Sequence, residues 1–251
     1  GAFRQQMMPY VYNQEVTRGS EAQWWTSHHD DYDTFLQAGS AGELGRRRRL
    51  EQAGFWRKVL EHPAYDTFWR EQAVDRLLAA RPLKVPTMIV HGLWDQEDIY
   101  GALAVYRALE PKDTGNDRVF LVIGPWYHGQ QIEEGSSLGS LRFNSDTAYY
   151  FRQELLRPFL ARHLKDTPGT EVPPVAVFET GTNRWLRLSS WPAGCPAGCE
   201  IQPTAFYLSP GLRLGIEEPK GTGMAFEEYI SDPAKPVPYR ARPIPPVGYG
   251  T

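Results

Sequence analysis

Long apolar runs are missing from this 251-residue sequence, and so is any strong excess of charge of one sign. No apolar stretch approaches the roughly 20 residues that a transmembrane helix needs, so such a helix is not expected. The formal net charge is only −3, so nucleic acid is not expected as the main partner. Hydrophobic residues make up 41% of the chain, enough for one large globular core or two smaller ones.

Cysteine is scarce, because only Cys195 and Cys199 occur, in the string Cys-Pro-Ala-Gly-Cys. A zinc site needs more ligands than these two and no histidine lies beside them, so a metal is not expected here. The spacer can turn tightly, which allows a small-loop disulfide and would indicate an exported protein. The alternative is a pair of unpaired thiols in a surface turn.

Two apolar, β-branched runs form the strongest pattern, and each ends in a glycine followed by polar residues. The first, Lys84–Val90, leads through Gly92 to Asp95, and the second, Val119–Ile123, leads through Gly124 to His128. Helix-forming residues with helical spacing lie between them. This predicts a strand–helix–strand unit of a parallel sheet, with both polar side chains at one edge. Open α/β sheets carry their chemistry at the carboxyl ends of the strands, so this edge is the candidate site.

An acid followed in the chain by a histidine fits the last two members of a hydrolase triad in the order Ser, Asp, His. Asp95 would orient His128 and stabilise its imidazolium, and His128 would take the proton from a nucleophile. Taken alone, Asp95 is as well explained as a helix-capping acid and His128 as a turn histidine beside Trp126. The two together, in this order at two strand ends, favour catalysis.

The strings His91-Gly-Leu-Trp-Asp-Gln-Glu-Asp98 and Gly124-Pro-Trp-Tyr-His128 resemble those of a family of serine hydrolases. That family includes cocaine esterase, X-Pro dipeptidyl-peptidases and α-amino-acid ester hydrolases, and the resemblance is greatest to the last. It covers essentially the whole chain. It implies the α/β fold class, with a helical cap at residues 1–80 and the C-terminal part of an α/β-hydrolase core at 81–166. The start of an incomplete jelly-roll β-sandwich would follow at 167–251.

The same resemblance implies a homotetramer that needs no cofactor and acts in the periplasm or outside the cell. The residue patterns by themselves agree with the coarse division of the chain. Beyond a linker at 165–174 only short strand patterns remain. Helical patterns occupy most of the preceding chain, and Pro158 predicts a kink or break in the last of them. These patterns cover Tyr32–Leu36, Glu43–Leu60, Thr67–Ala80 and Thr147–Leu164.

Two charged strings invite functional readings that the spacing does not favour. The run Arg46–Arg49 would wrap around several faces of a helix, so a solvated face or subunit contact explains it better than phosphate binding. His28 and His29 precede acids at positions 30, 31 and 33 without a recognised ligand spacing. A polar loop or an N-terminal helix cap explains this string better than a metal site.

The nucleophile of the expected triad is missing. No Gly-x-Ser-x-Gly elbow precedes Asp95, whereas Gly135-Ser-Ser137-Leu-Gly139 matches the motif but follows the histidine. Its flank at 130–134 is polar and cannot be the buried strand that an elbow needs, so Ser137 is not expected to act. The chain also lacks an initiator methionine and ends after a proline-rich segment. We therefore expect a piece of a longer polypeptide whose missing N-terminal part carries the serine, and no activity from this chain alone.

Glu97 and Asp98 follow the triad acid directly. In the first turn of a helix they would serve the helix dipole. The resemblance to α-amino-acid ester hydrolases instead implies that they bind the α-ammonium group of the substrate through charge-assisted hydrogen bonds.

The resulting hypothesis is an enzyme that forms an acyl-enzyme from an α-amino ester or amide. It would pass the acyl group to water or to an amine such as a β-lactam nucleus. The alternatives are an X-Pro dipeptidyl-peptidase or cocaine-esterase-like hydrolase, and a non-catalytic carbohydrate-binding protein. In the last case the Asp95 and His128 side chains should lie far apart.

Overall fold

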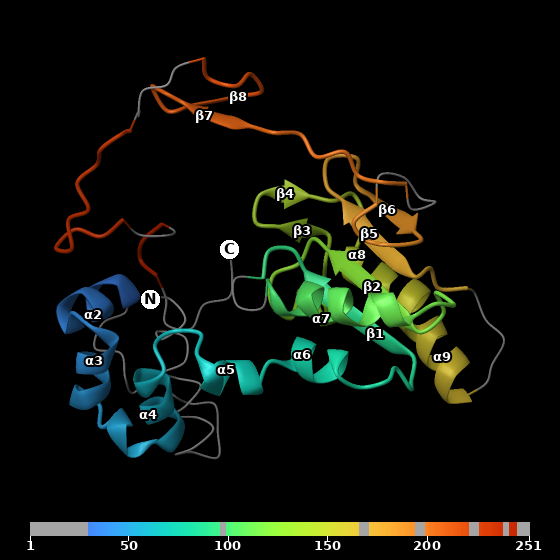
Figure 1. Ribbon diagram of the computed structural model, residues 1–251, viewed down its shortest axis with the longest axis horizontal. Helices are drawn as coiled ribbons and strands as arrows, with labels where there is room; N and C mark the ends of the chain where they lie inside the picture. The colour runs from blue at the N-terminus through green and yellow to red at the C-terminus, as the bar shows by residue number, and fades with distance from the viewer. Residues whose placement is uncertain are drawn as a thin grey trace.

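The computed structural model describes residues 30–95, 99–165, 171–193, 199–220, 226–237 and 241–244. The largest sheet among these residues has four strands in the order β1-β2-β5-β6 (Figure 1). The first three strands are parallel and β6 is antiparallel to β5. The strands are β1 (Thr87–Gly92), β2 (Val119–Gly124), β5 (Val175–Glu179) and β6 (Arg184–Leu188).

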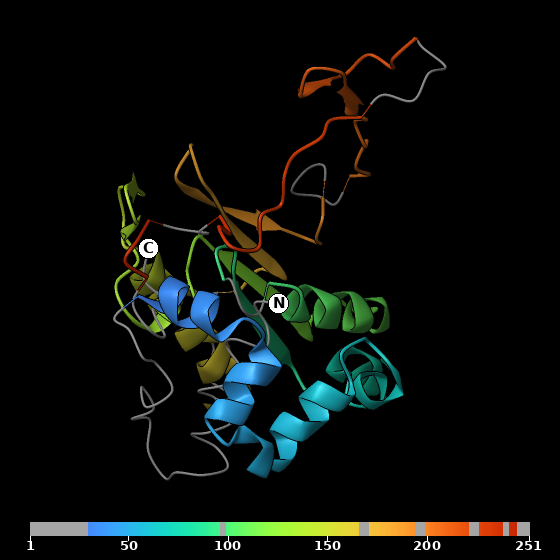
Figure 2. The same cartoon turned by 90° about the vertical axis from the view of Figure 1, so that its left-hand side faces the viewer.

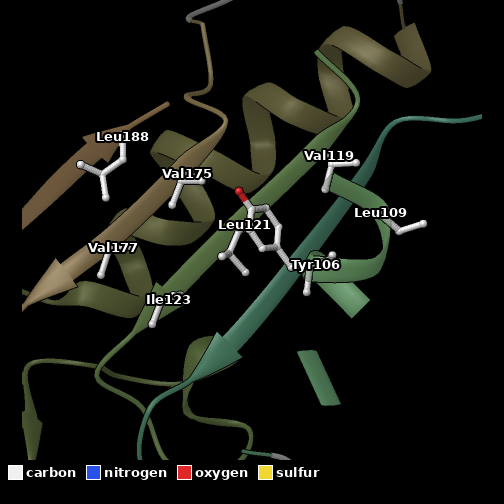
Figure 3. Close-up of a cluster of buried hydrophobic side chains, with 9 residues drawn as sticks. Tyr106, Leu109, Val119, Leu121, Ile123, Val175, Val177 and Leu188 are labelled. Carbon is white, nitrogen blue, oxygen red and sulfur yellow. The ribbon is translucent and has the colours of Figure 1, made fainter. Parts of the chain in front are cut away.

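The central strand β2 explains the layers on either side of the sheet. All of its residues are buried, and alternate side chains face opposite layers. Leu121 and Ile123 pack with Tyr106 and other residues of α7 (Gly101–Leu109) in one apolar cluster, whose side chains gather on one side of the strands in Figure 3. Phe120 and Val122 pack in a second cluster against the helix that runs from α8 (Thr147–Tyr150) to α9 (Arg157–Lys165).

The prediction of an irregularity near Pro158 is confirmed, although its form is not a break. A π-helical stretch, η4 (Phe151–Leu156), joins α8 to α9 immediately before the proline. Proline lacks the N–H that would bond four residues back and its ring crowds that carbonyl, so a wider turn there relieves both effects. The helix therefore remains continuous along the sheet.

Short helices fill the region before the sheet, as predicted, but one expected helix is divided. The pattern over Glu43–Leu60 predicted a single helix, and the structure breaks it at Arg49, whose φ is +61°. The break lets Leu44 and Trp56 enter one small apolar core. The elements are α2 (Asp31–Ala38), α3 (Ala41–Arg47), η1 (Leu50–Gln52), α4 (Gly54–Glu61), α5 (Thr67–Glu71) and α6 (Val74–Ala79).

The two charged strings of this region have structural roles in the described residues. Arg46 and Arg47 form ion pairs with Glu43 one turn earlier, so they lie on an exposed helix face. Asp30 caps α2, because its carboxylate accepts a hydrogen bond from the Tyr32 N–H at 3.0 Å. His28 and His29 lie outside the described residues. Within the described part of the chain, no group of three or more metal-ligating side chains is found.

The boundary predicted between core and β-sandwich, at residues 166 and 167, does not separate the sheets. β5 and β6 belong to the same sheet as β1 and β2, because the apolar run at residues 175–178 is buried beside β2 instead of starting a new sheet. Among the described strands, β7 (Tyr207–Ser209) and β8 (Arg213–Gly215) pair only with each other, and Figure 2 shows this hairpin standing away from the sheet. That this hairpin belongs to the start of a jelly-roll domain stays a prediction.

The remaining short elements surround the ends of the central strands. They are η2 (Glu110–Lys112), η3 (Gln130–Ile132), β3 (Ser137–Leu138) and β4 (Leu141–Arg142). Among the described helices, none is long and apolar enough to cross a membrane.

Candidate active site

The sheet brings Asp95 and His128 together. Each follows the carboxyl end of its parallel strand, and the His128 Nδ1 lies 2.9 Å from the Asp95 Oδ2. The Asp95 side chain is 11% exposed, whereas that of His128 is 39% exposed. The carboxylate is therefore held in the protein interior, and the imidazole is partly exposed.

Backbone hydrogen bonds hold the two turns in register beyond the end of the sheet. The N–H of Leu93 donates to the Gly124 carbonyl and that of Trp94 donates to the Trp126 carbonyl, each at 3.0 Å. A Cβ at Gly92 would lie 2.6 Å from that Trp126 carbonyl oxygen, so only glycine permits this approach. The parallel ladder thus continues into the loops and fixes the acid against the histidine.

The histidine stands in a tight turn of the loop after β2. The Gln130 N–H donates to the Tyr127 carbonyl at 3.1 Å, so His128 and Gly129 are its central residues. Gly129 has φ +88° and ψ −12°, the values of the third residue of a type II turn. Trp126 is fully buried beneath the turn, and its indole Nε1 donates to the Thr147 hydroxyl at 2.9 Å.

A cavity of about 350 Å³ opens beside the pair. Asp95, His128 and the turn glycine Gly129 line it, together with the buried His91 of β1. Gly101, at the start of α7, also borders a larger and more open hollow of about 1020 Å³. A substrate group in the smaller cavity would touch the acid–histidine pair directly.

Tyr127, which directly precedes His128, is also ionisable. The Tyr127 hydroxyl donates to the Glu133 carboxylate at 2.7 Å. That hydrogen bond, together with partial burial, raises the pKa of Tyr127 above its usual value. The tyrosine therefore stays protonated as a donor.

The other predicted site residues divide into two groups. Glu97 and Asp98 lie outside the described residues. Ser137 lies in β3, which pairs with β4 in a two-stranded hairpin, and the short helix η3 precedes it. A nucleophile elbow needs a strand that leads through a sharp turn into a helix, and Ser137 has no such setting.

Two polar residues of the site were not singled out from the sequence. Gln130 and Thr147 are buried and bond to groups around the histidine loop. A glutamine near a turn and a threonine at a helix start are ordinary in any sequence. Only their burial in the folded chain marks them.

Comparison with known proteins assigns this arrangement to a family. Residues 1–130, just over half of the chain, match the family model described as X-Pro dipeptidyl-peptidase (S15 family). The chain belongs to this family. The X-Pro dipeptidyl-peptidase family consists of hydrolases. The family and the 2.9 Å contact both argue against a non-catalytic carbohydrate-binding protein.

Solved structures show the same fold at close similarity. An aminopeptidase from the marine sediment archaeon Thaumarchaeota archaeon is 46% identical with a TM-score of 0.86, over 97% of this chain. An α-amino acid ester hydrolase labelled with selenomethionine is 47% identical with a TM-score of 0.87, over 94% of this chain. The chain spans 39% of the length of each. No curated protein matches. The predicted fold class, part of an α/β-hydrolase core, is thereby confirmed.

Proposed function

We propose that this chain is part of a serine hydrolase in which Asp95 is the acid and His128 the base of a catalytic triad. The hydrolase would act on esters or amides of α-amino acids. The observation that carries the proposal is the 2.9 Å contact between a buried carboxylate and a partly exposed imidazole beside a cavity. A carboxylate can only accept, so His128 Nδ1 carries the proton and Nε2 is left to act as the base.

In the proposed reaction Nε2 of His128 takes the proton of a serine hydroxyl as the serine oxygen attacks the substrate carbonyl. The imidazolium then gives this proton to the departing alcohol or amine, and an acyl-enzyme remains. A water molecule, activated by the same nitrogen, releases the acid and restores the serine. Asp95 stabilises the imidazolium in both halves, and its burial strengthens that attraction because the local dielectric is low.

The serine is proposed to come from polypeptide outside these residues. The sequence has no elbow before Asp95, and the chain spans only 39% of the solved structures that it resembles. The chain alone should then show no esterase turnover and no labelling by a fluorophosphonate. Labelling of Ser137 would contradict this part of the proposal.

The substrate class is proposed from the relatives together with the sequence. A peptidase acting at an amino terminus and a hydrolase of α-amino acid esters both take substrates whose amino group lies near the scissile bond. Glu97 and Asp98 would bind that group as an ammonium ion. Transfer of the acyl group to an amine, including a β-lactam nucleus, would compete with hydrolysis.

The alternative within the family is a dipeptidyl-peptidase or a cocaine-esterase-like hydrolase. Comparing an α-amino ester, its analogue without the amino group and an X-Pro dipeptide amide separates these possibilities. Preference for the α-amino ester supports the proposal. Equal rates with the analogue lacking the amino group would contradict it.

Location and assembly are also proposed. Cys199 is disulfide-bonded, and such bonds form and persist in the periplasm or outside the cell, where we place the enzyme. We also propose a homotetramer, which light scattering of the full-length protein would test.

The decisive test of the mechanism is substitution of the pair in the full-length polypeptide. Asp95→Asn keeps the shape but lets the imidazole take the wrong tautomer, and His128→Gln removes the base. Each should lower kcat/KM by about 10⁴-fold, the size known for such changes in serine proteases. Steady-state kinetics with an α-amino ester measures this.

His163→Gln is the matched control, because this histidine packs on Phe159 of α9 and Phe120 of the sheet, away from the cavity. It should retain wild-type kinetics. Activity within tenfold of wild type in both Asp95→Asn and His128→Gln would refute the triad.

A further inference from the structure

The side chain of Gln130 is an unusual feature of the loop that carries His128. It is polar and uncharged, yet the residue is only 3% exposed. Burial of an amide is unfavourable unless each of its polar groups is hydrogen-bonded. Its partners therefore indicate why a glutamine stands here.

Within the part of the chain that the structure describes, the side-chain hydrogen bonds of Gln130 all go to the backbone of this loop. The Gln130 Oε1 accepts from the Tyr127 N–H at 3.3 Å, and Nε2 donates to the carbonyls of Glu134 at 3.0 Å and Ser137 at 2.8 Å. The Gln130 main-chain N–H also donates to the Tyr127 carbonyl at 3.1 Å. Gln130 thus bonds to both the N–H and the carbonyl of Tyr127, and it links them to the Ser137 carbonyl further along the loop.

We propose that Gln130 is a positioning residue for the base His128, an inference that rests on the proposed function. His128 stands between Tyr127 and Gln130, so closure of this turn sets the direction from which its ring leaves the backbone. Asp95 holds the ring from the other side through the hydrogen bond between its Oδ2 and Nδ1 of His128. With the backbone fixed at one end and Nδ1 at the other, Nε2 is aimed at one place in the cavity.

The chemistry of an amide is what this position requires. The loop presents the N–H of Tyr127 and the carbonyls of Glu134 and Ser137 to this side chain, which must therefore accept once and donate twice. Methionine has nearly the same shape and supplies neither function. An ionised glutamate supplies the acceptor but would face two carbonyl oxygens without a donor.

Arg152 supports the outer part of the same loop. Its guanidinium donates to the carbonyls of Gln131 at 3.0 Å and Glu133 at 2.7 Å. The loop is therefore still attached to the helix at η4 when the Gln130 amide is removed. We expect the protein to fold after the substitution but the His128 ring to lose its fixed orientation.

The test is Gln130→Met in the full-length polypeptide. A displacement of about 1 Å in a catalytic group can lower the rate about 10²-fold, so kcat should fall by roughly 10- to 100-fold. KM should change less than threefold, because no substrate contact is removed. Gln130→Glu should be at least as impaired at neutral pH.

Two controls separate positioning from general destabilisation. Gln153→Met makes the same change at a glutamine of η4 that bonds only to Arg157 among the described contacts, and it should leave kcat unchanged. Phe159→Leu removes part of a buried side chain of the second apolar cluster and serves to match the loss of stability. An equal loss of kcat in Phe159→Leu at equal thermal stability would overturn the inference.

A double substitution distinguishes positioning from a purely structural role, because it measures whether the losses of activity from the two changes add. If Gln130 acts through the acid–histidine pair, Gln130→Met should cost little in an enzyme that already carries Asp95→Asn. Fully additive losses would contradict the inference. If Asp95→Asn itself leaves the activity intact, the triad fails. If it abolishes activity while Gln130→Met retains wild-type kcat, only the positioning role fails.

Discussion

Gly129 decides how the turn that carries His128 is closed. Its φ of +88° lies in the region that side chains of L-residues rarely adopt, and the residue directly follows His128. An added Cβ would meet no atom within 4 Å. The requirement for glycine is therefore one of backbone conformation and owes nothing to space.

Gly129→Ala should accordingly lower the free energy of unfolding by roughly 1–2 kcal/mol, the usual cost of a left-handed alanine. Gly129→Asn should cost less, because asparagine tolerates this region better. Denaturant unfolding of the three proteins measures both. Equal stability of the alanine and glycine proteins would mean that the turn can adopt another form.

At the scale of elements, the first turn of α8 anchors the far end of the histidine loop. The Thr147 hydroxyl donates to the Gly135 carbonyl at 2.7 Å and accepts from the Trp126 indole at 2.9 Å. The cap residue Asp146 accepts from the Gly135 N–H at 2.9 Å. The glycine that begins the misleading Gly-Ser-Ser-Leu-Gly string thus attaches the loop to a helix and takes no part in a nucleophile elbow.

Thr147→Val should be destabilising although it hardly changes the shape of the side chain. The substitution at this fully buried position leaves the indole N–H of Trp126 without its partner. It also removes one of two donors to the Gly135 carbonyl, which keeps the main-chain N–H of residue 147 at 3.2 Å. An unsatisfied buried group costs about 1–3 kcal/mol. Thr147→Ser keeps the hydroxyl and should lose much less. Thermal unfolding that ranks valine as equal to serine would show that the hydroxyl bonds contribute little.

At the scale of the whole molecule, an ion pair joins two segments far apart in the sequence. Arg242 Nε donates to the carboxylate of Asp30 at 2.7 Å, and the Ile244 N–H donates to the same group at 3.0 Å. The Arg242 guanidinium also stacks over the Tyr32 ring at 4.2 Å from its centre. The described end of the chain is thereby fastened to the first turn of α2.

This link should depend on pH. Burial raises the pKa of Asp30, but the hydrogen bonds from Ile244 and Arg242 outweigh it and hold the pKa below the ordinary value of 3.8. At neutral pH the carboxylate is charged in both folded and unfolded chains, and the link contributes fully. Its contribution falls as the pH drops below 3.8 through the folded pKa.

Arg242→Met should therefore destabilise the protein at pH 7, and the difference from wild type should shrink as the pH falls below about 4, near the ordinary carboxyl pKa. Unfolding of both proteins by denaturant across this range gives the comparison. Arg213→Met is the matched control, since this arginine lies exposed in the separate hairpin. A difference that stays constant with pH would exclude Asp30 as the partner that matters.

The sequence by itself determined the strand–helix–strand unit and the order of the acid and the histidine. Both depend on short-range features, because an apolar β-branched run ending in glycine and a polar residue is readable within ten or so residues. Parallel pairing then places the two strand ends at one edge. The contact between Asp95 and His128 follows almost directly.

Where the local sequence pattern fits two different structures, only the tertiary structure decided between them. The apolar run that begins at Val175 would suit a strand of a separate β-sandwich as well as a strand of the sheet that contains β1 and β2. In the structure it pairs in parallel with β2 and so belongs to that sheet. The helical spacing of apolar residues continues past Arg49, but the helix ends there in the structure, because Trp56 reaches the small apolar core only after a turn of the chain. Gln130 bonds to backbone groups of its loop and Arg242 bonds to Asp30, and only the folded chain brings these partners together. No local sequence pattern predicts such bonds.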